Sequence, residues 1–287
     1  MKKSKVIFLM IALIGTGVLV SCSTSGKNQI KDGEVMKSNR VKVVELLNSI
    51  ENGDMAPVAY INGEKYIQHN LAVADGLAGF GAALEALNGS GKVRVVRAFE
   101  DGEFVFAHTE YEFFGPKAGF DIFRFEDGLI VEHWDNLQPI ATETASGRTQ
   151  FDGSLEIRDI DKTDANKNLI SNFVHDILIG GKAEKLTDYI STEEYAQHNP
   201  GVKDGLAGLG EALGALAAAG TPMIYTQNHK ILGEGNFVLS VSEGNFLGKH
   251  SSYYDLFRIE NGLIVEHWDV IEEIPAESDW MNNNGKF

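Results

Sequence analysis

The chain has 287 residues, which is enough for one large domain or two of ordinary size. Its hydrophobic content of 43% with 23% charged residues is typical of a globular protein and excludes an intrinsically disordered one. The formal net charge of −16 argues against nucleic acid or an anionic membrane surface as a partner, because like charges repel.

The N-terminus has the pattern of an export signal. Lys2, Lys3 and Lys5 precede an apolar run over 6–20. That run is short for a membrane span and suits the apolar region of a secretory signal. The alternative is an uncleaved anchor.

Residues 19–22, Leu-Val-Ser-Cys, resemble a bacterial lipobox. The resemblance implies that a signal peptide over 1–21 is removed and that a lipid, with a palmitate-type chain, is attached to Cys22. Cys22 is the only cysteine, so an intrachain disulfide is excluded. We expect an exported lipoprotein of the bacterial cell envelope, held to a membrane through Cys22. The polar segment over 22–37 is typical of a flexible tether.

The rest of the chain contains one domain twice. Three sequence motifs are repeated: Gln-His-Asn at 68–70 and 197–199, Asp-Gly-Leu-Ala-Gly at 75–79 and 204–208, and Gly-Leu-Ile-Val-Glu-His-Trp-Asp at 128–135 and 262–269. A repeat of this length is a duplicated domain and not a solenoid unit. We expect a first domain over 38–151, a polar linker over 152–164 and a second domain over 165–287.

Both copies predict the same order of elements. Apolar residues at helical spacing predict a first helix, a short helical piece and a helix rich in glycine and alanine. From residue 92 the period becomes that of strands, separated by turn signals such as Asp127-Gly128. The strands expected in the first copy are 92–99, 103–114, 118–126 and 129–138. The fold class is therefore α+β, with helices followed by an antiparallel sheet of about four strands in each domain.

This order resembles the cone-shaped fold shared by nuclear transport factor, ketosteroid isomerase and polyketide cyclases. The specific words, Tyr-Ile-Gln-His-Asn, Asp-Gly-Leu-Ala-Gly and Asp-Gly-Leu-Ile-Val-Glu-His-Trp-Asp, are similar to those of the SnoaL-like cyclase branch. Within that branch they resemble bacterial proteins described as SnoaL-like aldol-condensation enzymes. The resemblance implies an apolar conical pocket in which an Asp removes a proton beside a carbonyl, with a His close by. It implies no metal and no cofactor. The fold hosts many activities and also plain binding modules.

The last strand of each copy carries the best candidates for chemistry. Alternate residues of a strand share a face, so His133 and Asp135 project together. If they enter the cone, Asp135 is the candidate general base, since burial raises the pKa of a carboxylic acid. His133 would orient it or bond the substrate. Alternatively the two form a satisfied polar pair at the cone's mouth or at an interface.

Three further residues are candidates for the same site. Asp121 falls within one residue of register with Asp135 across the hairpin, although an ion pair with an arginine is an equal alternative. His69 follows a helical segment, and it either serves the pocket or fixes a loop. His108 is replaced by Val241 in the second copy; an inward His108 would make the second copy the weaker one, and a surface His108 would not.

The second copy repeats most of these candidates, as Asp269, His267, Asp255 and His198. Aromatic residues expected to line the pockets are Trp134, Phe123, Trp268 and Phe257, unless they serve the core. No His-x-x-x-His or cysteine cluster indicates a metal site.

Domains of this kind often pair through their sheets, so we expect an intramolecular pseudo-dimer. Its outer sheet faces would carry Arg124 and Glu132, with their repeats Arg258 and Glu266.

Three functions stay open at this stage. The first is an enzyme of cyclase, isomerase or aldol type, acting on a small apolar or carbonyl-containing molecule. The second is a lipid-anchored binding module without chemistry, and the third is an assembly lipoprotein. A buried carboxylate in an enclosed cavity would favour the first.

Overall fold

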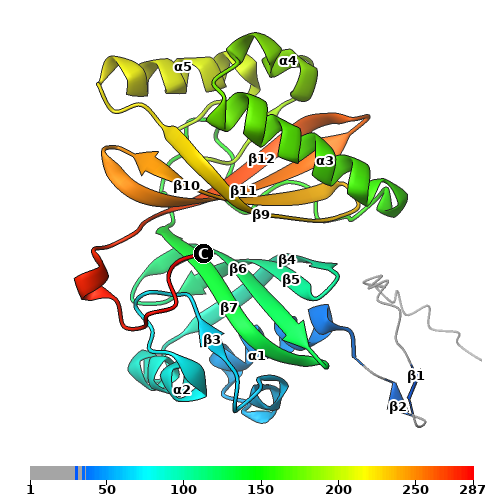
Figure 1. Ribbon diagram of the computed structural model, residues 1–287, viewed down its shortest axis with the longest axis vertical. Coiled ribbons are helices and arrows are strands. Elements are labelled where there is room, and N and C mark those ends of the chain that lie inside the picture. The colour runs from blue at the N-terminus through cyan, green and yellow to red at the C-terminus, as the bar shows by residue number, and fades with distance from the viewer. Residues whose placement is uncertain (1–29, 32–33, 36) are drawn as a thin grey trace, which may run out of the picture.

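The computed structural model describes residues 30–31, 34–35 and 37–287 (Figure 1). The predicted signal peptide, the lipidation site Cys22 and most of the tether lie outside the described residues. Within the tether, Ile30–Lys31 and Glu34–Val35 form a short antiparallel ladder, β1 and β2. No helix in the described part of the chain is long and apolar enough to cross a membrane.

Two halves with the same order of elements follow. The first contains α1 Asn39–Asn52, η1 Ala56–Tyr60, β3 Ile67–Gln68, α2 Gly76–Leu87, β4 Lys92–Asp101, β5 Phe104–Glu112, β6 Pro116–Glu126 and β7 Leu129–Pro139. The second contains η2 Ile160–Lys162, α3 Thr163–Phe173, a π-helical turn η3 Val174–Ile179, η4 Ala183–Lys185, α4 Leu186–Tyr189, β8 Ala196–Gln197, α5 Gly205–Ala218, β9 Ile224–Glu234, β10 Phe237–Phe246, β11 Lys249–Glu260, β12 Leu263–Glu273 and η5 Glu277–Asp279. The predicted pair of tandem α+β domains is confirmed. Helix α3 begins inside the segment predicted as linker.

Each half has a five-stranded sheet, ordered β3-β7-β6-β5-β4 and β8-β12-β11-β10-β9. The four long strands form the expected antiparallel meander. The fifth strand is short and pairs in parallel with the last one, Gln68 opposite His133 and Gln197 opposite His267. The Gln-His-Asn segment was expected in a loop. Its pairing with the last strand places it beside His133 in the first half and beside His267 in the second.

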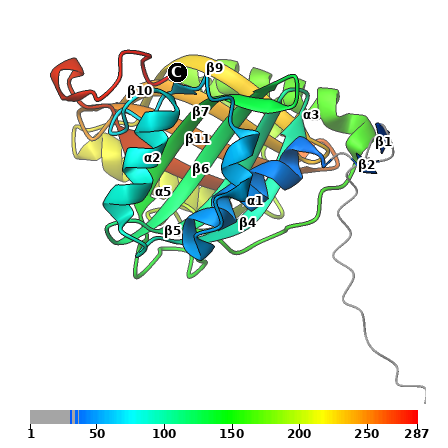
Figure 2. The ribbon, with the colours of Figure 1, turned by 90° about the horizontal axis from the view of Figure 1, so that it is seen from below.

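The helices cover one face of each sheet, as Figure 2 shows for α1 and α2. Helix α1 starts where the Ser38 hydroxyl accepts the Val41 N–H, and it ends at Gly53, whose φ of 71° suits glycine. Its buried side chains Val43, Leu46 and Leu47 pack with the aromatic and aliphatic residues of the sheet. Helix and sheet thus enclose the space between them.

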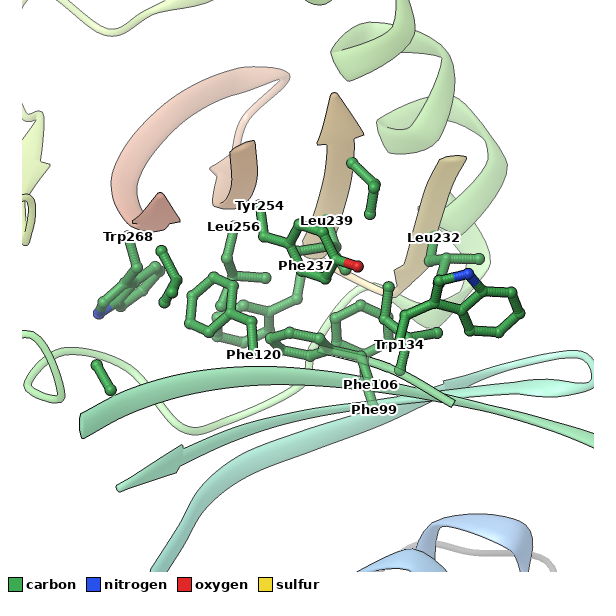
Figure 3. Packing of buried hydrophobic residues seen from close by; sticks show 14 residues of the cluster. Phe99, Phe106, Phe120, Trp134, Leu232, Phe237, Leu239, Tyr254, Leu256 and Trp268 are labelled. Atoms are coloured by element: carbon green, nitrogen blue, oxygen red, sulfur yellow. The ribbon is translucent and has the colours of Figure 1, made fainter. Parts of the chain in front are cut away.

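The opposite faces of the two sheets pack against each other (Figure 1). This inter-sheet layer is built almost equally from both halves: Phe99, Phe106, Ala118, Phe120, Ile122 and Trp134 from the first, and Leu232, Phe237, Leu239, Val241, Tyr254, Leu256, Trp268 and Val270 from the second. Figure 3 shows Trp134 and Trp268 at opposite ends of the layer, with Phe106 and Phe120 between them. Burying this much apolar surface makes the layer a major source of stability.

The segment that follows each sheet crosses to the other half. After β7, the Thr149 carbonyl accepts a hydrogen bond from His198 Nδ1 at 2.7 Å. After β12, the Gly285 carbonyl accepts one from His69 Nδ1 at 2.8 Å. Asn284 also donates to the Gln68 carbonyl at 3.0 Å. We call these segments, 140–153 and 274–287, the exchanged tails. Each tail is anchored on the Gln-His-Asn segment of the other domain.

Candidate functional site

Two carboxylates lie directly opposite each other on the central strands of each sheet. Asp121 on β6 pairs in register with Asp135 on β7, and Asp255 pairs with Asp269. Counting outward from the turn placed Asp121 opposite residue 134. A register shift between Arg124 and Phe125 accounts for the difference.

His133 lies beside the pair and its orientation is fixed by Gln68. The Gln68 amide oxygen accepts the Asn70 N–H at 2.8 Å and lies 3.0 Å from His133 Nδ1. An oxygen in that position requires a proton on Nδ1. His133 Nε2 then points at Asp121 Oδ1, 3.3 Å away. A proton must be present between these two atoms, carried by the histidine or by the acid.

Asp121 is suited to hold that proton. It is buried, and burial raises the pKa of its carboxyl group, against the opposing effect of His133. Its other oxygen accepts the Tyr111 hydroxyl at 2.8 Å. The expected alternative of an arginine partner is wrong, because Arg97 and Arg124 lie on the other face of the sheet and pair elsewhere.

Asp135 has one oxygen tied and one without a partner. Its Oδ2 accepts the Asn70 side-chain amide at 2.8 Å. Its Oδ1 is buried and has no hydrogen-bond partner among the described residues. Because buried acceptors are ordinarily satisfied, this oxygen is the atom of the site that a ligand would meet.

The second domain repeats the arrangement. Asn199 donates to Asp269 Oδ2 at 2.6 Å, Asp269 Oδ1 has no partner in the described chain, and His267 Nε2 lies 3.1 Å from Asp255 Oδ1. Burial raises the pKa of Asp269 to about 6. The pKa of His267 is raised by Asp255 and Asp269, although burial opposes them. At neutral pH Asp269 is therefore a stronger base than an ordinary aspartate.

Both sites open into a cavity between helices and sheet, of about 430 Å³ in the first domain and about 550 Å³ in the second. Apolar side chains dominate the walls, among them Phe80 and Leu84 in the first and Leu209 and Leu213 in the second. Phe123 and Phe257 line the cavities as predicted. These volumes suit a small organic molecule.

A metal ion is the other group that these side chains could hold. One ligand atom each from Asp121, His133 and Asp135 lies within 4.8 Å of the others, as do those of the equivalent trio in the second domain. Two carboxylates and an imidazole suit a divalent cation. The prediction that the site needs no metal stays a prediction.

Four predicted site residues lie on the face of their sheet that is turned away from the cavity: His69, His198, Trp134 and Trp268. His69 and His198 stack on Trp134 and Trp268 with ring centroids 4.7 Å apart, on the face turned to the other domain. Strand alternation explains this, because Gln68 and Asn70 point to the cavity and His69 between them points away. Their bonds to Glu132 and Glu266, both 2.9 Å, make them part of the inter-domain face.

Arg124 and Glu132 share that outer face as expected, with Nε 2.6 Å from the carboxylate. Arg258 and Glu266 repeat the pair at 2.5 Å. Both pairs bind within their own sheet.

His108 is also misplaced by the sequence argument. It is buried in the inter-sheet layer, where its ring meets Phe120 at 4.6 Å and its Nδ1 lies 2.7 Å from Arg97 Nη1. Burial, and then the Arg97 charge, holds the pKa of His108 well below its usual range. It is a neutral acceptor for Arg97, not a pocket acid. Its replacement by Val241, which lies in the same layer, therefore removes no group from the second cavity.

Sequence reasoning missed the residues that orient the site. They are the flanking pairs of the Gln-His-Asn segment and one tyrosine in each domain: Gln68, Asn70, Tyr111, Gln197, Asn199 and Tyr225. The repetition of Gln-His-Asn did indicate a functional segment, but the prediction assigned the role to its histidine and not to the glutamine and asparagine. Alternation along a short strand would have favoured its neighbours.

Comparison with known protein families finds no match to the chain, and comparison with curated proteins finds none. Solved structures do show similarity. TsrD from Streptomyces laurentii is 21% identical, covering 36% of this chain and 92% of its own, with a TM-score of 0.31. An NTF2-like protein of unknown function from Cytophaga hutchinsonii is 16% identical, covering 37% and 95%, with a TM-score of 0.33. IdmH from Streptomyces antibioticus, a candidate polyketide cyclase, is 19% identical, covering 37% and 91%, with a TM-score of 0.30. Each of these matches covers little more than one third of this chain.

Proposed function

We propose that each domain is an enzyme that removes a proton next to the carbonyl group of a small apolar molecule, as a cyclase, isomerase or aldol-type catalyst. Asp135 and Asp269 are the general bases. The observation that carries the proposal is the Oδ1 of each, which is buried against an apolar cavity and accepts no hydrogen bond from the residues that the structure describes. A desolvated carboxylate is a stronger base than one in water.

The neighbouring residues fit the remaining steps. The base takes the proton from carbon, and the electron pair moves to the carbonyl oxygen. The proton held between His133 and Asp121 is then close enough to the pocket to be offered to that oxygen. Asn70 fixes the base by holding its second oxygen. The second domain uses Asp255, His267 and Asn199 in the same way.

The alternative function is a binding module that holds an apolar ligand without chemistry. The apolar walls suit that function equally well. The orphan carboxylate oxygen does not, because a site that only binds apolar molecules gains nothing from a desolvated charge.

The setting of the protein is part of the proposal. The lipobox-like sequence supports an exported lipoprotein anchored through Cys22 in the bacterial cell envelope. The packed sheets and exchanged tails support an intramolecular pseudo-dimer.

The experiment follows deuterium incorporation next to the carbonyl of an apolar bicyclic ketone, 1-decalone, in D2O by NMR. Asp135→Asn and Asp269→Asn should each remove one domain's contribution, and the double variant should lose enzymic exchange altogether. In Asp135→Asn, the remaining rate should rise as pH rises through about 6, because Asp269 must be ionised to act. Circular dichroism checks folding. Exchange by the double variant at the wild-type rate would refute the assignment.

A further inference from the structure

The two cavities differ in charge, although their inner ends are the same. The first has Lys117 and Glu272 on its wall, and the second has no lysine, arginine or glutamate among the residues that line it. The positions equivalent to Lys117 and Glu272 are Ser251 and Gln138. Because the domains share their proposed catalytic groups, this difference concerns what else the ligand carries.

Lys117 stands on the cavity side of β6. It shares that face with Gly119, Asp121 and Phe123, since alternate residues of a strand point the same way. It lies four positions before Asp121, which is about 13 Å along the strand. Lys117 is half-buried and forms no ion pair with any residue that the structure describes.

Glu272 does not cancel this charge. Its carboxylate is paired with the buried ammonium of Lys286 on the exchanged tail. Lys286 also donates to the Asp135 carbonyl at 2.7 Å. The pair is therefore neutral as a unit, and Lys117 supplies the remaining cation at the mouth. Between Lys117 and Asp121 the side chains of Tyr111 and Leu137 lie over Gly119, where a Cβ would meet them at 2.5 and 2.9 Å.

We propose that the first domain takes an amphiphile with an anionic end, a carboxylate or a sulfonate, and that the second domain takes a neutral apolar ligand. The anion would lie at Lys117 and the apolar body between helix α2 and the sheet, with its reactive end at Asp135. The Asp135 carboxylate repels an anion at the inner end, which leaves only this orientation. The inference rests on the proposed function in treating the cavities as ligand sites.

Two dyes of one scaffold test the proposal: anionic 1-anilinonaphthalene-8-sulfonate and neutral N-phenyl-1-naphthylamine, titrated by fluorescence and calorimetry. Ala83 and Ala212 line the two cavities at equivalent positions of α2 and α5, so Ala83→Trp and Ala212→Trp fill one cavity each. In Ala212→Trp both dyes should bind. In Ala83→Trp the neutral dye should bind. The anionic dye should bind to Ala83→Trp at least tenfold more weakly than it binds to Ala212→Trp.

Lys117→Gln is the decisive variant. It should weaken the anionic dye about tenfold in the first cavity and leave the neutral dye unchanged. Ser251→Lys, in the Ala83→Trp background, should strengthen the anionic dye in the second cavity. If a tryptophan variant does not fold, Lys117→Gln in the otherwise unchanged chain gives the same answer, by losing one anionic-dye site while keeping two neutral-dye sites.

Equal affinity of the anionic dye in Lys117→Gln and wild type would overturn the proposal. So would an equal loss of both dyes, which would mean that Lys117 only supports the wall. Neither result touches the exchange of 1-decalone, so failure here is distinct from failure of the proposed function. Conversely, absent exchange with charge-dependent dye binding would leave the pocket assignment standing without the chemistry.

Discussion

Tyr111 on β5 and Tyr225 on β9 donate hydrogen bonds to equivalent carboxylates from strands that are not equivalent. Tyr111 bonds Asp121 at 2.8 Å and Tyr225 bonds Asp255 at 3.2 Å. The position of Tyr111 is Gly244 in the second domain, where a Cβ would lie 1.9 Å from the Ile224 carbonyl oxygen. The tyrosine stands on a different strand in each domain, yet both domains keep the hydrogen bond to the carboxylate. This indicates that the carboxylate requires the hydrogen bond.

Tyr111→Phe should therefore slow first-domain exchange about fivefold, the effect of one hydrogen bond. The Tyr111 hydroxyl lowers the pKa of Asp121, so its loss should raise that pKa further. NMR titration of the Asp121 carboxyl group in the Asp269→Asn background measures the shift. Tyr60→Phe, whose hydroxyl bonds Glu45 on the surface side of α1, serves as the control. An unmoved Asp121 titration would contradict this role.

Asp269→Asn should stabilise the protein at neutral pH. The pKa of Asp269 is raised from 3.8 to about 6, so its contribution to stability is fully present below 3.8 and is lost as pH rises through about 6. Removing the ionisable group removes a penalty of about 3 kcal/mol above that range. Thermal unfolding at several pH values checks this. The exposed variant Asp188→Asn should leave the pH profile unchanged, and a less stable Asp269→Asn at pH 7 would show the direction to be wrong.

Lys286→Met should damage the first site more than the second. It leaves the Glu272 carboxylate without its partner beside Asp135, at a cost of about 3 kcal/mol for a broken buried pair. The melting temperature should fall, and exchange in the Asp269→Asn background should fall with it. Gln150→Met at the equivalent place on the other tail removes no charge and should have the smaller effect. Equal losses in both domains would instead indicate a general loss of packing.

The sequence predicted what depends on local spacing. Alternation along β7 placed His133 and Asp135 on one face, and turn dipeptides located the hairpin. The prediction for His69 was wrong because the direction of its side chain depends on β3, a strand too short to show a periodic sequence pattern. Prediction from the sequence failed again where the inter-sheet layer received a polar residue, as with His108. The paths of the exchanged tails depend on contacts more than two hundred residues apart, such as Asn284 with Gln68, and no local pattern records them.

The exchanged tails have a consequence for how the two sites can differ. In a pair of identical subunits every substitution appears twice, so both sites change together. Here the segments that reach across belong to one chain, and the effective concentration of each tail at its neighbour is independent of dilution. Lys286 can therefore serve one site while Gln150 occupies its place at the other. The two domains thus stabilise each other through their tails as the subunits of a dimer would, while their sequences and their sites can differ.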